Sequence, residues 1–229
     1  QWQMPLYRLD FATVQGMYVG QSEGRLKDAL STAEHVSPCI MWIDEIEKGL
    51  VGATQGGGDG GVSVRMVGQF LFWLQECKKP VFVVATANDV SKLPPELLRR
   101  GRFDELFFVD LPTNEERKEI ISLYIKRFLR MEIKDDLMEQ LVNISEGFAG
   151  SDIESAAREV GYKIIANENM EVTDELLKSS FQNVVPLSKT APEKIEDIRN
   201  WGRERAVPAS GQPIGGITSS NKPRRMVLV

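Results

Sequence analysis

CIMWIDE, at residues 39–45, places five apolar residues directly before two acids. A short run that is apolar at every position is typical of an interior strand of a parallel sheet, because both faces of such a strand are covered. Asp44 and Glu45 then emerge where this strand ends. Since open α/β sheets bind their ligands at the carboxyl ends of the strands, we predict a functional site at these two acids.

Three further apolar runs are predicted as strands, over Pro5–Phe11, Val81–Thr86 and Leu106–Val109. Helical patterns over Glu23–Val36 and Val64–Cys77 alternate with the first of these strands. This alternation predicts an α/β fold with a parallel sheet and helices on its faces.

Beyond Pro112 the pattern becomes helical, so we divide the chain into an α/β region (1–111), a small all-helical domain (112–185) and a C-terminal tail (186–229). The tail is rich in Pro, Gly and Ser after Ala206, and we expect it to be largely disordered apart from a short charged helix over Pro192–Arg203. Four helices are predicted in the all-helical domain. The first follows a capping box formed by Thr113 and Glu116 and ends at about Leu129, and the second covers Asp135–Ser145. The third follows a capping box formed by Ser151 and Glu154, and the fourth, capped by Thr173, runs from Asp174 to about Asn183.

Composition argues against several classes of function. The 229 residues carry 28 basic and 33 acidic side chains, and this acidic balance provides no overall field to hold nucleic acid. Cys39 and Cys77 lie in apolar stretches without metal-ligand spacing, as buried thiols of a reducing compartment do. The single histidine, His35, excludes an HExxH zinc-protease helix, and no apolar run is long enough to cross a bilayer.

The two acids at 44 and 45 suit phosphoryl transfer, which needs a metal-binding oxygen and a group that activates water. Asp44 at the strand end could hold Mg²⁺, and Glu45, pointing elsewhere, could act as the base. A strand ending in solvated acids is the simpler alternative. Asn88 follows the strand at Val81–Thr86 and could hold the attacking water, although taken alone it is better explained as a turn asparagine.

Two arginines, Arg99 and Arg102, flank Gly101 and could present their guanidinium groups to phosphate oxygens. They could equally form surface ion pairs with Asp104 and Glu105. In an acidic chain, arginine fingers that act on a neighbouring subunit's nucleotide are the more specific hypothesis.

Five motifs follow one another along the chain: Tyr18–Glu23 (YVGQSE), Pro38–Ile46 (PCIMWIDEI), Ala85–Asn88 (ATAN), Leu97–Asp104 (LLRRGRFD) and Glu146–Ile153 (EGFAGSDI). In this order they resemble the motifs of AAA ATPases, and the resemblance covers residues 5 to 185. A finer similarity, over Phe70–Glu76, Lys78–Pro80 and Pro94–Pro112, is to an AAA family encoded in algal plastids and cyanobacteria.

The resemblance implies roles for the residues already singled out. Asp44 and Glu45 match Walker B, as metal-binding acid and catalytic base, and Asn88 matches sensor 1. Arg99 and Arg102 match the arginine fingers, although Arg100 stands between them where proline is usual.

Further roles are implied outside the strand ends. Gly150 and Ser151 match the small-domain turn that packs near the base and ribose of the nucleotide. Tyr18 and Val19 match an aromatic–aliphatic pore loop that grips an extended polypeptide by apolar contact. A buried Tyr18 that stabilises its own loop is the alternative.

The resemblance implies an ATP- and Mg²⁺-dependent ring ATPase, most simply a hexamer, that remodels a protein partner in the cytoplasm or the plastid stroma, with no role for a membrane. GxxxxGK[ST], the phosphate-binding loop of this class, does not occur in the chain, and the central strand that would precede it is missing as well. We therefore expect the chain to be inactive alone. A non-enzymatic scaffold or regulator, and an AAA protein acting on nucleic acid, remain the alternative functions.

Overall fold

The computed structural model describes residues 2–14, 21–50, 60–99, 101–167 and 171–216, which form two compact units divided between Glu105 and Leu106. Each unit is described by itself below. The predicted pore-loop residues Tyr18 and Val19 lie outside the described residues.

The first unit contains a parallel three-stranded sheet in the order β1 (Leu6–Leu9), β2 (Cys39–Ile43), β3 (Val81–Ala85). This confirms the predicted parallel sheet, except that the fourth predicted strand, over Leu106–Val109, is not part of it. Ile43 is aligned with Leu9 on one side and Ala85 on the other, so the three strands end at the same level. The residues that follow β2 and β3 therefore meet at one edge of the sheet.

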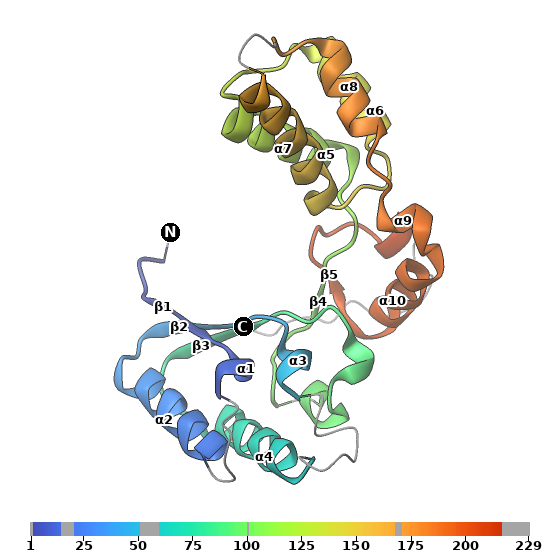
Figure 1. The fold of residues 1–229 in the computed structure, drawn as a ribbon. Coiled ribbons are helices and arrows are strands. Elements are labelled where there is room, and N and C mark those ends of the chain that lie inside the picture. Colours follow the sequence, from blue (N-terminus) through green and yellow to red (C-terminus); the bar gives the residue numbers. More distant parts are fainter. Residues whose placement is uncertain (1, 15–20, 51–59, 100, 168–170, 217–229) are drawn as a thin grey trace. The chain divides into compact units, whose positions relative to one another are not determined.

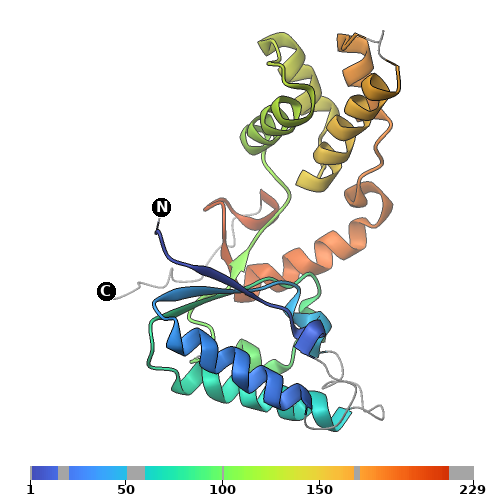
Figure 2. The ribbon, with the colours of Figure 1, turned by 60° about the vertical axis from the view of Figure 1, so that its left-hand side comes forward.

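Helices α2 (Gln21–His35) and α4 (Gly60–Glu76) lie together on one face of this sheet (Figures 1 and 2). Side chains alternate along each strand, and those that face the two helices form the core. The opposite face carries half-buried or exposed side chains of the same strands. The buried members of this core include residues of the strands (Leu9, Cys39, Met41, Ile43), of α2 (Leu26, Leu30, Ala33) and of α4 (Met66, Val67, Phe70, Leu71).

Short elements connect these parts of the first unit. Helix α1 (Phe11–Val14) follows β1, and α3 (Ile46–Leu50) follows β2 directly after the two acids. Two 3₁₀ helices, η2 (Val90–Lys92) and η3 (Pro95–Leu98), follow β3. Helix α3 was not predicted, because its five residues are too few to show a helical period.

The second unit contains the predicted helices α5 (Asn114–Leu129), α6 (Asp135–Ile144), α7 (Gly150–Ala166) and α8 (Asp174–Gln182), which share one core. The capping box of Thr113 and Glu116 is confirmed, as is the cap at Thr173.

The predicted start of α7 is wrong. The carboxylate of Asp152 accepts a hydrogen bond of 2.9 Å from the N–H of Ala149, so the helix begins at Gly150 rather than after a Ser151 cap. An acid three residues into a helix can reach back to the free N–H groups there, and Asp152 takes this position instead of Glu154.

The chain after residue 186 is more ordered than we expected. It forms α9 (Leu187–Thr190), α10 (Pro192–Arg205), β5 (Val207–Pro208) and the 3₁₀ helix η4 (Ile214–Gly216), and β5 pairs in parallel with β4 (Phe107–Phe108). The prediction rested on composition, which contains no information on the pairing of β5 with β4, a strand 100 residues earlier in the sequence. Residues 217–229 lie outside the description, and none of the described helices is long and apolar enough to cross a membrane.

Candidate functional site

Thr86 connects the ends of β2 and β3. Its backbone N–H donates to the carbonyl of Ile43 at 2.9 Å, which continues the sheet by one residue. Its hydroxyl donates to Oδ1 of Asp44 at 2.7 Å and accepts the N–H of Glu45 at 2.9 Å. One threonine side chain thus fixes both predicted acids at the carboxyl edge of the sheet.

Glu45 is held by two side chains. The amide Nδ2 of Asn88 donates to Oε1 of Glu45 at 2.9 Å, and Lys48 forms an ion pair with Oε2. The hydrogen bond to Glu45 raises the pKa of Lys48, with smaller contributions from nearby acids. The structure therefore brings the predicted base and the predicted amide into direct contact.

Asp44 lies on the other side of Thr86. Its Oδ2 is 3.6 Å from a guanidinium nitrogen of Arg8, whose guanidinium carbon is also 5.3 Å from the centre of the Trp42 ring. The side chain of Asp44 remains 35% exposed, so its carboxylate can still reach a ligand.

A carboxylate oxygen of this kind fits Mg²⁺, which proteins usually bind through one or two carboxylates with substrate phosphates and water completing the shell. The described residues contain no group of three His, Cys, Asp or Glu side chains suited to a metal by themselves. Asp44 would thus contribute one ligand rather than a complete cage.

The predicted arginine pair follows η3. Arg99 is exposed, and the Nε of Arg102 is buried without a hydrogen-bond partner in the described residues. Gly101 between them has a φ of 85°, a conformation that glycine adopts without strain. None of the hydrogen bonds or ion pairs found in the described ranges joins Arg99 or Arg102 to the two acids.

Gly150 and Ser151 belong to the second unit, in the first turn of α7. Gly150 lines a cavity of about 330 Å³ together with apolar side chains. These are contributed by β4 and the residue after it (Phe108, Val109) and by α10 (Ile195, Ile198).

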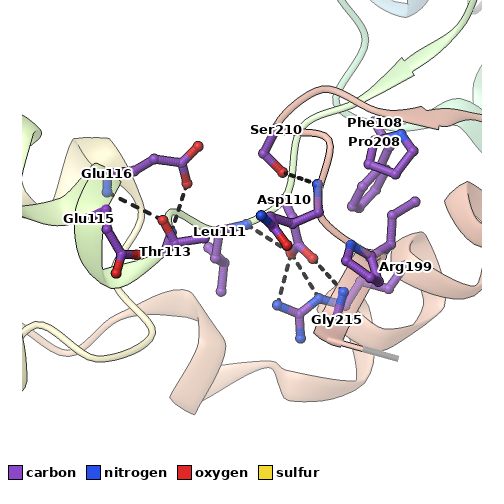
Figure 3. Close-up of a pocket in the computed structure, with 13 residues that line it drawn as sticks. Phe108, Asp110, Leu111, Thr113, Glu115, Glu116, Arg199, Pro208, Ser210 and Gly215 are labelled. Carbon is purple, nitrogen blue, oxygen red and sulfur yellow. Dashed lines mark hydrogen bonds and ion pairs between the residues drawn. The ribbon is translucent and has the colours of Figure 1, made fainter. Parts of the chain in front are cut away.

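A larger cavity of about 770 Å³, also in the second unit, is lined in part by Asp110 (Figure 3). Burial alone would raise the pKa of Asp110, but hydrogen bonds from Arg199, Gly215 and Leu111 outweigh it and hold the pKa below its ordinary value. Arg199 contacts Oδ1 through two nitrogens, both at 2.8 Å, and the N–H of Gly215 donates to Oδ2 at 2.8 Å. This cluster was not predicted from the sequence, because Arg199 and Gly215 lie 89 and 105 residues after Asp110.

Sequence reasoning also missed Thr86, Lys48, Arg8 and Glu47 in the first unit. Thr86 was visible beside Asn88, and its place at a strand end was the available signal. Glu47 gave no signal, because an acid in a short helix after a strand is ordinarily solvated.

The comparisons with known proteins agree with the α/β fold. Residues 1–111 match the family described as "ATPase family associated with various cellular activities (AAA)". These residues belong to the AAA family. The crystal structure of the FIGL-1 AAA domain in complex with ADP matches with a TM-score of 0.69 at 18% identity, covering 87% of this chain and 68% of that one, which shows a shared fold.

Two relatives of the chain carry the description "Uncharacterized AAA domain-containing protein ycf46". That of Guillardia theta is 42% identical over 201 residues, covering 88% of this chain and 39% of the relative. That of Pyropia yezoensis is 40% identical over 210 residues, covering 91% of this chain and 42% of the relative. The chain therefore spans about two fifths of the length of these relatives.

Proposed function

We propose that the complete protein hydrolyses ATP at the cluster formed by Asp44, Glu45 and Asn88. The observation that carries the proposal is the amide of Asn88 at 2.9 Å from the carboxylate of Glu45, at an edge where Thr86 fixes both acids. Membership of the AAA family supports nucleotide binding in general, and ADP is bound by the FIGL-1 domain of the same fold.

In this proposal Glu45 accepts a proton from the water that attacks the terminal phosphorus of ATP, and the bond from that phosphorus to the leaving oxygen of ADP breaks. Asn88 holds the carboxylate of Glu45 and is placed to orient the water. Asp44 would hold Mg²⁺, which neutralises charge on the phosphates when it is bound.

The remaining residues complete the proposed site in an assembly. Arg99 and Arg102 act on the nucleotide of an adjacent subunit, which requires a homo-oligomer, and we propose a hexamer. Gly150 and Ser151 pack near the base and ribose. Mixing a Glu45→Gln protein with an Arg102→Ala protein should then restore activity that neither has alone, and mixtures that stay inactive would count against shared sites.

Protein remodelling is the proposed use of the hydrolysis, in the cytoplasm or plastid stroma. The support is the sequence of Tyr18 and Val19, which suits sequence-tolerant apolar gripping of a polypeptide. Unfolded polypeptide should stimulate ATP hydrolysis and DNA should not. Stimulation by DNA alone would favour the nucleic-acid alternative.

The test of hydrolysis is Glu45→Gln in the complete protein, because the 229-residue chain contains no GxxxxGK[ST] and we propose that it is inactive alone. Removal of a general base lowers a rate by roughly 10²–10⁴-fold. We expect kcat for ATP to fall by at least about a hundredfold, while the Kd for ATP, measured by calorimetry, stays unchanged.

Glu76→Gln is the matched control, since Glu76 ends α4 and is exposed. It should leave kcat unchanged. Normal turnover in the Glu45→Gln protein would refute the assigned base, and a wild-type protein that neither binds nor hydrolyses ATP would favour a scaffold.

A further inference from the structure

Glu47 is an acid inside the first unit. It lies in the first turn of α3 and is only 3% exposed. Glutamate is almost never this deeply buried without a partner, because a carboxylate loses its hydration on burial. The position of Glu47 therefore needs a reason.

The described partner of Glu47 is the backbone of Asn88. The N–H of Asn88 donates to Oε1 of Glu47 at 3.1 Å, whereas Oε2 is buried with no hydrogen-bond partner among the described residues. Only one oxygen of Glu47 is thus used, and it is used on the residue whose side chain reaches Glu45.

The same turn is fixed to α3 at a second point. The N–H of Ile46 donates to the carbonyl of Thr86 at 2.9 Å. Thr86 and Asn88 are therefore both hydrogen-bonded to consecutive residues of α3. With the backbone of Asn88 held by Glu47, its amide side chain is directed to the carboxylate of Glu45 at 2.9 Å.

We propose that Glu47 is a positioning residue for ATP hydrolysis, which acts by holding the backbone N–H of Asn88 so that the Asn88 amide meets Glu45. This inference rests on the proposed hydrolytic function. Glu47 itself touches neither substrate nor Glu45 in this role. Glu47 contributes by keeping the Asn88 amide in position, because displacement of a catalytic group by about 1 Å can slow a reaction up to roughly a hundredfold.

Three substitutions of Glu47 in the complete protein distinguish the effect of an acceptor at the right distance from the effects of side-chain charge and packing. Glu47→Gln keeps an oxygen acceptor at the same distance from the Asn88 N–H. Glu47→Met fills the same space without an acceptor. It leaves the Asn88 N–H without its partner, at a cost of about 1–3 kcal/mol, so a cooperative unfolding transition is checked before its activity is compared. Glu47→Asp keeps the charge but shortens the side chain by one methylene.

We expect Glu47→Met and Glu47→Asp to lower kcat for ATP by roughly tenfold, within the range that small displacements cause. The Kd for ATP should not change. Glu47→Gln should keep kcat within about threefold of wild type, because the length and acceptor are retained. Unchanged kcat in both Glu47→Met and Glu47→Asp would overturn the inference, as would equal losses in all three proteins.

A double-mutant cycle separates positioning from a general structural role. If Glu47 acts through the Asn88 amide, Glu47→Met should have no further effect on kcat in an Asn88→Ala background. Losses that multiply would show that Glu47 acts independently of Asn88 and would overturn the inference. Should Glu47→Met lack a cooperative unfolding transition, the same cycle is run with Glu47→Asp.

The result also distinguishes this inference from the proposed function. If Glu45→Gln abolishes hydrolysis but the Glu47 variants behave as wild type, only the positioning role fails. If wild-type protein has no ATPase activity, the proposed function itself fails.

Discussion

Glu45 adopts a left-handed backbone conformation with a φ of 47°, which costs a residue with a side chain about 1–3 kcal/mol. Such conformations persist only where neighbouring groups hold them. Here the hydroxyl of Thr86 accepts the Glu45 N–H, and Asn88 holds the carboxylate. The turn sends the side chains of Asp44 and Glu45 to different partners, as two different chemical roles require.

Asp110 offers a test of electrostatics at the scale of one residue. Because its pKa is lower in the folded protein than the ordinary value of 3.8, the folded state holds fewer protons there than the unfolded state. This contribution to the free energy of unfolding is complete above the ordinary pKa and is lost as the pH falls through the lower folded pKa. We expect Asp110→Asn to lower stability by roughly 2 kcal/mol at pH 7, through weaker bonds to Arg199.

The pH dependence of the free energy of unfolding gives a more specific prediction for Asp110. Urea unfolding between about pH 5 and pH 2 should show a smaller acid-induced loss of stability in Asp110→Asn than in wild type. Asp197→Asn is the control, because Asp197 is exposed on the same α10 helix. Parallel curves for wild type and Asp110→Asn would contradict the assigned ion pair.

At the scale of elements, α10 packs closely on β4. A Cβ added at Gly202 would lie 2.6 Å from a ring carbon of Phe108, a distance that side chains do not tolerate. The absence of a side chain at Gly202 therefore lets α10 approach the strand that pairs with β5.

We predict that Gly202→Ala lowers the free energy of unfolding by about 1–3 kcal/mol through overpacking, measured by urea denaturation. Gly24→Ala, at the fourth residue of α2, is the matched control, because nothing lies within 4 Å of its added Cβ. That change should instead stabilise the protein by about 0.5–1 kcal/mol, as alanine replaces glycine in a helix. A stabilising Gly202→Ala change would show that α10 does not approach β4 in this way.

Elements with a local signature could be predicted from the sequence. β2 and β3 are short apolar runs. Thr113 and Thr173 cap the starts of α5 and α8 with their hydroxyl groups, and such caps can be predicted from the sequence. The contact of Glu45 with Asn88 was also predictable in outline, because parallel strands end at a common edge.

Elements that depend on distant partners could not be predicted. β5 consists of Val207 and Pro208, too short to show a period, and it is recognised only by its pairing with β4. The burial of Glu47 arises from how α3 packs beside the turn at Asn88, which no local pattern records.

At the scale of the whole molecule, the proposed ATPase activity is that of the complete protein. The described residues form two units, and the twin acids belong to the first while Gly150 and Ser151 belong to the second. The chain spans about two fifths of the length of the ycf46 relatives, and the activity of the complete protein is accordingly a proposal.

The most direct measurement is the structure of the complete Glu45→Gln protein with ATP and Mg²⁺ bound. We predict that the metal lies against a carboxylate oxygen of Asp44 and that the terminal phosphate lies beside position 45 and the Asn88 amide. ATP bound away from these three residues, with no part of the nucleotide at this edge of the sheet, would contradict the account.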